Sequence, residues 1–241
     1  MRLIHLSDIH LVENGKKIWD TDTKLNFEKA IEKILSIKNL DAIFVSGDLS
    51  NDGSLWTYKY IDESFKSIGV PTYCCPGNHD NVEMMTNGYM PSFYSTKDKI
   101  SINGWDFYFL DSSIIDMSRG CLSKDTLYYL KIELSKSSNP SCIVFHHPPI
   151  EPGGWLNRKL LENIDEFNNL VSNYSNVKLI LFGHIHYHVN RKINNIMYSS
   201  ASSTGFTFDL NLPKFQIAKG NEGFILIEIL DDNISIQNIK I

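Results

Sequence analysis

Five short apolar runs in this sequence each end directly in a group of acidic, amide or imidazole side chains. The run that ends at Leu6 leads into Ser-Asp-Ile-His, and the run that ends at Val45 leads into Ser-Gly-Asp. The runs that end at Cys75, Phe145 and Phe182 lead into Pro-Gly-Asn-His-Asp, His-His-Pro-Pro and Gly-His-Ile-His. In open α/β sheets the functional crevice lies beyond the carboxyl ends of the strands. If each run is a strand, all five groups converge on one site.

The segments between these runs alternate in periodicity between strand and helix. Strands are expected at residues 3–6, 42–46, 72–75, 105–110, 141–145 and 178–182, and amphipathic helices at residues 23–37, 55–68, 124–134 and 164–174. From Tyr187 onward the helical periodicity stops, and strands are expected at residues 189–193, 196–200, 223–230 and 234–239. The alternation predicts an α/β fold, with the last strands in a second, mixed sheet.

The length and composition indicate one domain. A chain of 241 residues with 42% hydrophobic and 12% aromatic residues has enough apolar material for one substantial core. We therefore expect residues 1–241 to form a single domain. The stretches at residues 81–99, 150–161 and 202–221 carry Pro, Gly and Asn, and they are expected to be active-site loops.

The charge balance argues against a nucleic-acid substrate. The formal net charge is −5 and the pI is about 5.9, so the chain lacks the basic footprint that phosphate-backbone binding requires. Small anions remain suitable substrates, because bound divalent cations would make the mouth of a site locally positive whatever the total charge.

The sequence gives no sign of export or of membrane insertion. The N-terminal residues lack a long apolar segment and a small-residue cleavage site. The apolar runs are strand-sized, well below the roughly 20 residues that span a bilayer. The four cysteines show no Cys-x-x-Cys spacing. We expect a soluble protein with reduced thiols in the cytoplasm. The oligomeric state stays open, with a dimer among the options.

The polar groups at the strand ends have the chemistry of metal ligands. Oxygen and imidazole donors without thiolates suit Mn, Fe, Zn or Ni better than a structural zinc site. Two metals about 3.5–4 Å apart can hold a phosphoryl oxygen, lower the pKa of a bridging water and stabilise the attacking and leaving oxygens. We therefore expect a two-metal phosphoesterase, with these candidate ligands: Asp8, His10, Asp48, Asn78, His146, His184 and His186.

Individual roles follow from the residue types. Asp48 stands alone at its strand end and is the candidate for the carboxylate that bridges the metals. Asn78 offers a neutral oxygen that adds no negative charge to repel phosphate. His79 is expected to protonate the departing alkoxide or stabilise its charge, and Asp80 to orient the His79 imidazole by accepting a hydrogen bond.

Other histidines, aromatic residues and cysteines are better explained by packing. His5 and His188 are expected to be packed histidines outside the ligand set. Three loop aromatics have two interpretations, stacking on a nucleobase or local packing, and packing is the favoured one: Trp155, Phe206 and Phe208. The adjacent Cys74 and Cys75 are expected to pack inside a strand.

Taken together, the five groups resemble the calcineurin-like metallophosphoesterase family, through Asp-x-His, Gly-Asp, Gly-Asn-His-Asp, a lone His and Gly-His-x-His. The resemblance covers nearly the whole chain. It implies a four-layer αββα sandwich of two mixed sheets and two divalent or mixed-valence ions, Mn or Fe first and Zn or Ni as alternatives. It also implies two ligand sets that share one residue, namely Asp8, His10, Asp48 and His186 for one metal, and Asp48, Asn78, His146 and His184 for the other. His146 fits the family's His-x-Pro position, so His147 is expected to point elsewhere.

Within this family the chain looks most like the bacterial class III 3′,5′-cyclic AMP phosphodiesterases. The similar blocks are Leu-Ser-Asp-Ile-His-Leu, Gly-Asp-Leu-Ser-Asn-Asp-Gly, Pro-Gly-Asn-His-Asp, Leu-Asp-Ser-Ser and His-His-Pro-Pro. The resemblance implies hydrolysis of a small nucleotide phosphodiester, cyclic AMP to AMP, with no membrane or stable nucleic-acid partner. The match loosens at residues 119–122 and 204–221, which are expected to border the non-phosphate part of the substrate.

Two alternatives to cyclic AMP hydrolysis remain. The first keeps the metals and changes the substrate to a 2′,3′-cyclic nucleotide, a nucleotide diphosphate conjugate, a lipid-linked pyrophosphate or a phosphoprotein. The second is a scaffold that keeps the fold without catalysis. The scaffold is disfavoured because no expected ligand is missing from the sequence.

Overall fold

The computed structural model describes residues 1–13, 16–86, 99–209, 214–231 and 233–241, and its elements follow the predicted ones. The strands are β1 (Arg2–Leu6), β2 (Ala42–Ser46), β3 (Thr72–Cys75), β4 (Lys99–Ile102), β5 (Trp105–Phe109), β6 (Ser141–Val144), β7 (Val177–Phe182), β8 (Val189–Ile193), β9 (Ile196–Ser200), β10 (Gly223–Leu230) and β11 (Asn233–Lys240). The helices are α1 (Thr23–Ser36), α2 (Leu55–Ile68), α3 (Val82–Met84), α4 (Lys124–Lys136), α5 (Ile164–Ser172) and the 3₁₀ helix η2 (Gly154–Arg158). Every predicted strand and helix is confirmed. Among the described residues, the elements that were not predicted are α3, β4 and η2.

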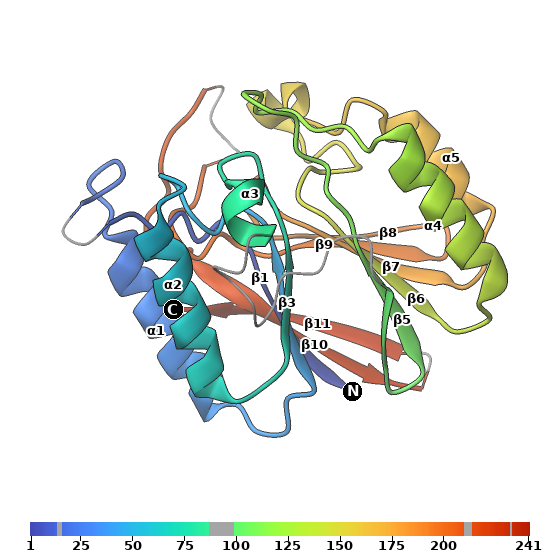
Figure 1. Ribbon diagram of the computed structural model, residues 1–241, viewed down its shortest axis with the longest axis horizontal. Coiled ribbons are helices and arrows are strands. Elements are labelled where there is room, and N and C mark those ends of the chain that lie inside the picture. Colours follow the sequence, from blue (N-terminus) through green and yellow to red (C-terminus); the bar gives the residue numbers. More distant parts are fainter. Residues whose placement is uncertain (14–15, 87–98, 210–213, 232) are drawn as a thin grey trace.

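Two sheets lie face to face between two pairs of helices (Figure 1). In the described residues, one sheet has the order β11-β10-β1-β2-β3 and the other has the order β4-β5-β6-β7-β9-β8. The helices α1 and α2 cover the outside of the first sheet, and α4 and α5 cover the outside of the second (Figure 1). This arrangement confirms the predicted αββα sandwich of two mixed sheets.

The alternation of side chains along the strands creates the layers. In β2, Ile43 and Val45 pack against the helices of the first sheet, whereas Ala42 and Phe44 face the core between the sheets. Successive side chains of a strand point to opposite faces, so a strand that is apolar throughout contributes to two cores at once. The same rule separates Cys74, in the helix-facing core, from its neighbour Cys75, in the core between the sheets.

The helix ends carry local signals. Side chains at the start of four helices accept a hydrogen bond from a main-chain N–H of the first turn, namely Asp22 in α1, Ser54 in α2, Asn81 in α3 and Ser123 in α4. Such caps satisfy donors that the helix itself leaves open. Gly69 follows the last residue of α2, and its φ of 72° suits glycine.

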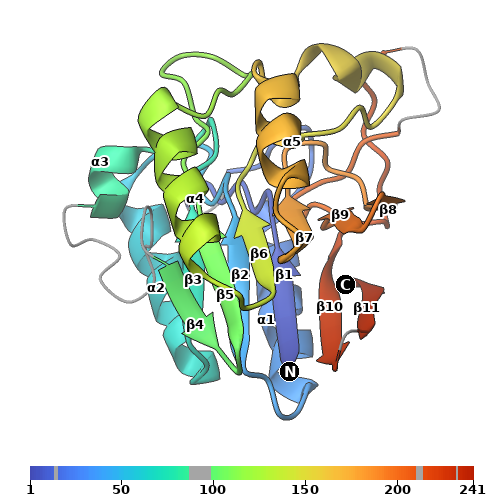
Figure 2. The same ribbon diagram turned by 90° about the vertical axis from the view of Figure 1, so that its right-hand side faces the viewer.

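The last four strands divide between the two sheets, which corrects one expectation. The strands β8 and β9 extend the second sheet next to β7. The strand β10 instead pairs antiparallel with β1, with Leu3 opposite Ile227, and β11 forms the edge beyond it. Segments from the two ends of the chain therefore lie side by side (Figure 2). The periodicity of a segment predicts a strand, but it carries no information about the pairing partner.

The parallel strands place the predicted ligand groups at one edge. The strand β1 runs parallel to β2, and β2 runs parallel to β3. In the second sheet β5, β6 and β7 are likewise parallel.

No helix among the described residues is long and apolar enough to cross a membrane.

Candidate metal centre

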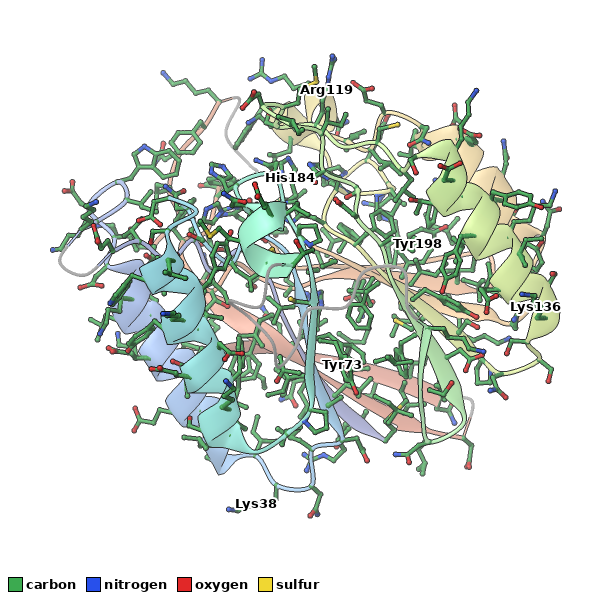
Figure 3. The ribbon with its side chains drawn as sticks, in the orientation of Figure 1. Lys38, Tyr73, Arg119, Lys136, His184 and Tyr198 are labelled. Carbon is green, nitrogen blue, oxygen red and sulfur yellow. The ribbon has the colours of Figure 1, made fainter. Side chains whose placement is uncertain are left out.

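The turns after five strands meet where the carboxyl ends of the two sheets adjoin. Asp8 follows β1, Asp48 follows β2 and Asn78 follows β3, while His146 follows β6 and His184 follows β7. The main-chain N–H of His184 donates to both carboxylate oxygens of Asp8, at 3.1 and 3.0 Å, and so joins the two sheets. Figure 3 shows His184 between the two helix layers, among other nitrogen-bearing side chains.

One group of potential ligands consists of Asp8, His10, Asp48 and His186. Its four ligand atoms all lie within 4.8 Å of one another, and all four residues are buried. His186 Nε2 lies 3.2 Å from Asp8 Oδ1, and His10 Nε2 lies 3.4 Å from Asp48 Oδ2. These are the four residues that the resemblance implied for one metal.

A second group of potential ligands, which includes His146 and His184, lies on the other side of Asp48. His146 Nε2 lies 3.3 Å from Asp48 Oδ2, and His184 Nδ1 lies 3.1 Å from His146 Nε2. The Oδ2 atom of Asp48 is therefore next to both groups. Asn78 Oδ1 and His184 Nε2 are buried and have no hydrogen-bond partner among the described residues. Buried polar atoms normally have partners, so these two atoms fit a site that takes a cation.

The position of His147 corrects another expectation. Its ring centroid lies 4.7 Å from that of His184, and it forms a potential ligand group with His146 and His184. Its Nδ1 is paired with Ser112 Oγ at 2.9 Å, while its Nε2 has no partner among the described residues. The side chain thus borders the second group instead of pointing elsewhere. A Cβ atom on Gly120 would lie 2.2 Å from His147 Nδ1, so this approach depends on glycine.

The backbone at the candidate ligands is strained. Five of them have a positive φ, at 53° for Asp8, 47° for His10, 51° for Asp48, 70° for His184 and 49° for His186. For residues other than glycine this region costs about 1–2 kcal/mol each. Such strain persists where the surrounding structure imposes it, and it concentrates at functional sites. The shared conformation shows that the turns hold these side chains at an energetic cost.

Hydrogen bonds behind the imidazoles fix their orientation. His146 Nδ1 lies 2.7 Å from the Ser46 carbonyl oxygen, and His186 Nδ1 lies 2.7 Å from the Phe206 carbonyl oxygen. Because a carbonyl only accepts, both Nδ1 atoms donate, and neutral rings then present the lone pair of Nε2 to the centre. His10 Nδ1 similarly lies 3.1 Å from Asn51 Oδ1. The carbonyl partners have no signature in the sequence, because any residue type supplies them.

The imidazoles of the centre differ in their pKa, because burial lowers the pKa of His10 to about 3 and holds that of His184 well below its usual value. Burial by itself lowers the pKa of His146, but the charge and hydrogen bond of Asp48, together with Asp8, raise it to about 9. Burial by itself raises the pKa of Asp48, yet the charge of His146 and its hydrogen bond outweigh burial and hold that pKa well below its usual range. Buried carboxylates that stay ionised attract a metal cation, and imidazoles that stay neutral can donate a lone pair to it. The residues present therefore fit metal ions.

His79 and Asp80 have separate roles in the structure. His79 is exposed, its ring lies 4.9 Å from that of His10, and its main-chain N–H donates to Asp48 Oδ1 at 2.8 Å. The oxygens of Asp80 instead accept from four donors, which are the N–H groups of Leu49, Ser50 and Gly77 and the hydroxyl of Tyr58. Asp80 therefore ties the turns after β2 and β3 together, and the expectation that it orients His79 is wrong.

A cavity of about 420 Å³ opens over the first ligand group. Two of the expected loops contribute to its lining, through Trp155, Lys159, Phe206, Phe208 and Phe215. Part of the third expected loop, at residues 87–98, and residues 210–213 lie outside the described residues. Phe206 and Phe208 are almost fully buried, and Phe208 stacks on His186 with a centroid distance of 4.3 Å. They pack against the imidazole of a candidate ligand, so the packing interpretation holds for these two residues.

His5 and His188 lie outside both groups, as expected. His5 Nε2 is paired with Ser46 Oγ at 2.7 Å inside β1, and burial lowers the pKa of His5 to about 3. His188 Nδ1 donates to the Ser200 carbonyl at 2.8 Å.

The glycine before Asn78 gives a direct test of the close packing. A Cβ atom on Gly77 would lie 2.1 Å from Asp48 Oδ1 and 2.3 Å from Asp48 N. Gly77→Ala is therefore expected to displace Asp48 and to lower the expected phosphoesterase activity by roughly 100-fold or more, the loss expected when a reacting geometry shifts by about 1 Å. Steady-state kinetics with a chromogenic phosphodiester measures this loss.

Gly69→Ala is the control for Gly77→Ala, because a Cβ there meets open space at a φ of 72° and strains only the backbone. It should lower the melting temperature and keep the activity. Equal activities of the two variants would contradict the assignment.

The sequence is similar to those of known proteins. A family model described as calcineurin-like phosphoesterase matches residues 1–188. A 3′,5′-cyclic-nucleotide phosphodiesterase from Nostoc sp. is 31% identical over 95% of this chain and 88% of its own length. A probable glycerophosphodiester phosphodiesterase from Arcobacter nitrofigilis is 30% identical over 89% of this chain and 82% of its own length.

The fold also matches that of solved structures. The crystal structure of a dimetal phosphatase from Danio rerio superposes with a TM-score of 0.76, covering 98% of this chain and 95% of that chain, at 10% sequence identity. At this identity the likeness shows a common fold.

Proposed function

Because this chain belongs to the calcineurin-like phosphoesterase family, a family of hydrolases, we propose that it hydrolyses a phosphodiester in a small nucleotide, 3′,5′-cyclic AMP to AMP. The observation that carries the proposal is the position of Asp48 Oδ2, 3.4 Å from a nitrogen of one ligand group and 3.3 Å from a nitrogen of the other. A carboxylate oxygen between two sets of buried donors suits a pair of cations better than a single one.

The proposed ligands form two sets that share Asp48. One set is Asp8, His10, Asp48 and His186, and the other is Asp48, Asn78, His146 and His184. When bound, two such metals would polarise the phosphoryl group and supply hydroxide at neutral pH. The structure favours His146 over His147, because Ser46 holds the His146 ring with Nε2 toward Asp48.

His79 is the residue proposed to protonate the leaving oxygen. It lines the cavity beside His10, and its side chain is exposed, so it can reach a bound substrate. As an imidazolium it would donate a proton to the departing 3′-oxygen of the ribose, which is a strong base and a poor leaving group without one. The bond from its main chain to Asp48 keeps the residue next to the phosphate site.

A nucleotide substrate is supported by the cavity and by the relatives. The volume of about 420 Å³ lies in the range of small-molecule sites, and the cavity wall is rich in aromatic side chains. The Nostoc relative carries a cyclic-nucleotide name, and the sequence blocks resemble those of cyclic AMP phosphodiesterases. The Arcobacter relative favours glycerophosphodiesters as the second candidate.

A substrate panel tests the proposal. The Mn-loaded protein is expected to hydrolyse bis-p-nitrophenyl phosphate and 3′,5′-cyclic AMP, and to lose both activities when a chelator removes the metal. Glycerophosphoethanolamine and 2′,3′-cyclic AMP complete the panel, with metal content measured on the same samples. Two metal ions per chain and the highest kcat/KM for 3′,5′-cyclic AMP are the expected results. No turnover of any phosphodiester would remove the proposed function.

A further inference from the structure

An exposed tryptophan occupies a strained turn at the mouth of the cavity. Ile18 and Thr21 exchange two main-chain hydrogen bonds, at 3.0 and 2.8 Å, around Trp19 and Asp20. Both central residues have positive φ, 45° for Trp19 and 59° for Asp20. A two-residue turn of this kind normally takes Asn-Gly or Gly-Gly, because a bulky side chain is disfavoured at positive φ. The local backbone therefore does not explain the presence of tryptophan.

Packing does not explain Trp19 either. The side chain is 54% exposed although it is the largest apolar residue type. Its ring lies edge-on to Phe206 at 4.9 Å and tilted against Phe215 at 4.7 Å, and Phe215 is itself 42% exposed. The two rings are in contact and both line the cavity, so they form a contiguous exposed apolar surface at its entrance, and such a surface is a candidate binding site.

Trp19 is also close to the reaction centre. It lines the same cavity as His10 and Asp48. Phe206, which it contacts, has its ring centroid 4.9 Å from that of His10 and 4.5 Å from that of His186. One aromatic ring therefore separates Trp19 from two candidate metal ligands. If the phosphate of a substrate binds at the metal site, the rest of the substrate would lie near the exposed aromatic surface.

We propose that Trp19 and Phe215 form a stacking platform for the nucleobase of the substrate, and that Trp19 determines specificity. The inference rests on the proposed function and names the part of the substrate that these residues recognise. A purine offers a planar face to the indole, whereas the glycerol end of a glycerophosphodiester offers none. Trp155 lines the same cavity, and its buried indole N–H has no partner among the described residues, so it is a candidate donor for a ring nitrogen of the base.

Binding of AMP and of ribose 5-phosphate to the Mn-loaded protein tests the platform, because the two molecules differ only by the base. Isothermal titration calorimetry is expected to show tighter binding of AMP. Trp19→Ala should weaken AMP binding by roughly 5- to 150-fold, the value of one base–aromatic stack, and leave ribose 5-phosphate binding unchanged. Trp19→Phe should recover part of the loss. Tyr128→Ala, which removes a 65% exposed aromatic residue from α4, is the control and should change neither affinity.

The outcomes separate the platform from the proposed function. If AMP and ribose 5-phosphate bind equally well, or if Trp19→Ala weakens both to the same extent, the stacking platform is wrong even when cyclic AMP is hydrolysed. If AMP binds through Trp19 while no phosphodiester is turned over, the platform stands and the proposed reaction fails. With cyclic AMP as the substrate, Trp19→Ala should raise KM and change kcat little, since the stack lies away from the phosphorus.

Discussion

Asp48→Asn is expected to lower kcat/KM for phosphodiesters by about 1,000-fold and to reduce the metal content from two ions to one or none. The asparagine keeps an oxygen that accepts from the His79 N–H, a bond of 2.8 Å in the structure. It replaces the oxygen that lies between the two ligand groups by an amide NH₂, which cannot bind a cation. The loss of the several kcal/mol that metals contribute to transition-state stabilisation corresponds to about this factor. Kinetics and metal analysis of the purified variant measure it.

Asp106→Asn is the matched control for this substitution. Asp106 is also a fully buried carboxylate, but it lies at the start of β5, where Ser101, Ser137 and Asn139 donate to it. The same chemical change should affect stability there and leave the metal content at two ions. An Asp48→Asn protein that retains both metals and a tenth of the activity would refute the role of Asp48 as the bridge.

His79→Ala is expected to have an effect that depends on the leaving group. Loss of the general acid should lower kcat for cyclic AMP by about 100- to 10,000-fold. With bis-p-nitrophenyl phosphate the loss should be about tenfold or less, because nitrophenolate leaves without a proton. The substitution should leave Asp48 in place, because the hydrogen bond to Asp48 comes from the main-chain N–H of residue 79, which an alanine retains.

The comparison of the two substrates decides what His79 does. Similar losses with both would mean that the imidazole positions the phosphate and does not protonate the leaving group. Metal content serves as the internal check, and it should stay at two ions because His79 is outside both ligand groups.

A large part of the fold was predictable from local patterns in the sequence. The runs at β2 and β3 and the periodic segment at α2 were predicted with the bounds that the structure has. The apolar runs of the strands and the periodic spacing of apolar residues in the helices are patterns within a short stretch, so they are readable along the chain. The residue types of the candidate ligands were equally readable, because metal chemistry restricts them to carboxylate, amide and imidazole.

The predictions that failed concern residues whose contacts are distant in the sequence. Asp80 follows His79 directly, which suggested a hydrogen bond between their side chains, yet its oxygens accept from Leu49, Ser50, Gly77 and Tyr58. His147 was expected to point elsewhere, yet its ring lies next to His184. Trp19 was overlooked, because nothing in its neighbours along the chain indicates that Phe206 and Phe215 lie beside it.

The sequence by itself thus determined which segments become strands and helices, and which side chains carry the chemistry at their ends. The tertiary structure decided that β10 pairs with β1, that Asp48 Oδ2 lies between two ligand groups, and that five of the candidate ligands adopt positive φ. The physical reason is one of range. Periodicity and ligand type are properties of a short stretch of chain, whereas strand pairing, backbone strain and the orientation of an imidazole by a distant carbonyl exist only once remote segments are in contact.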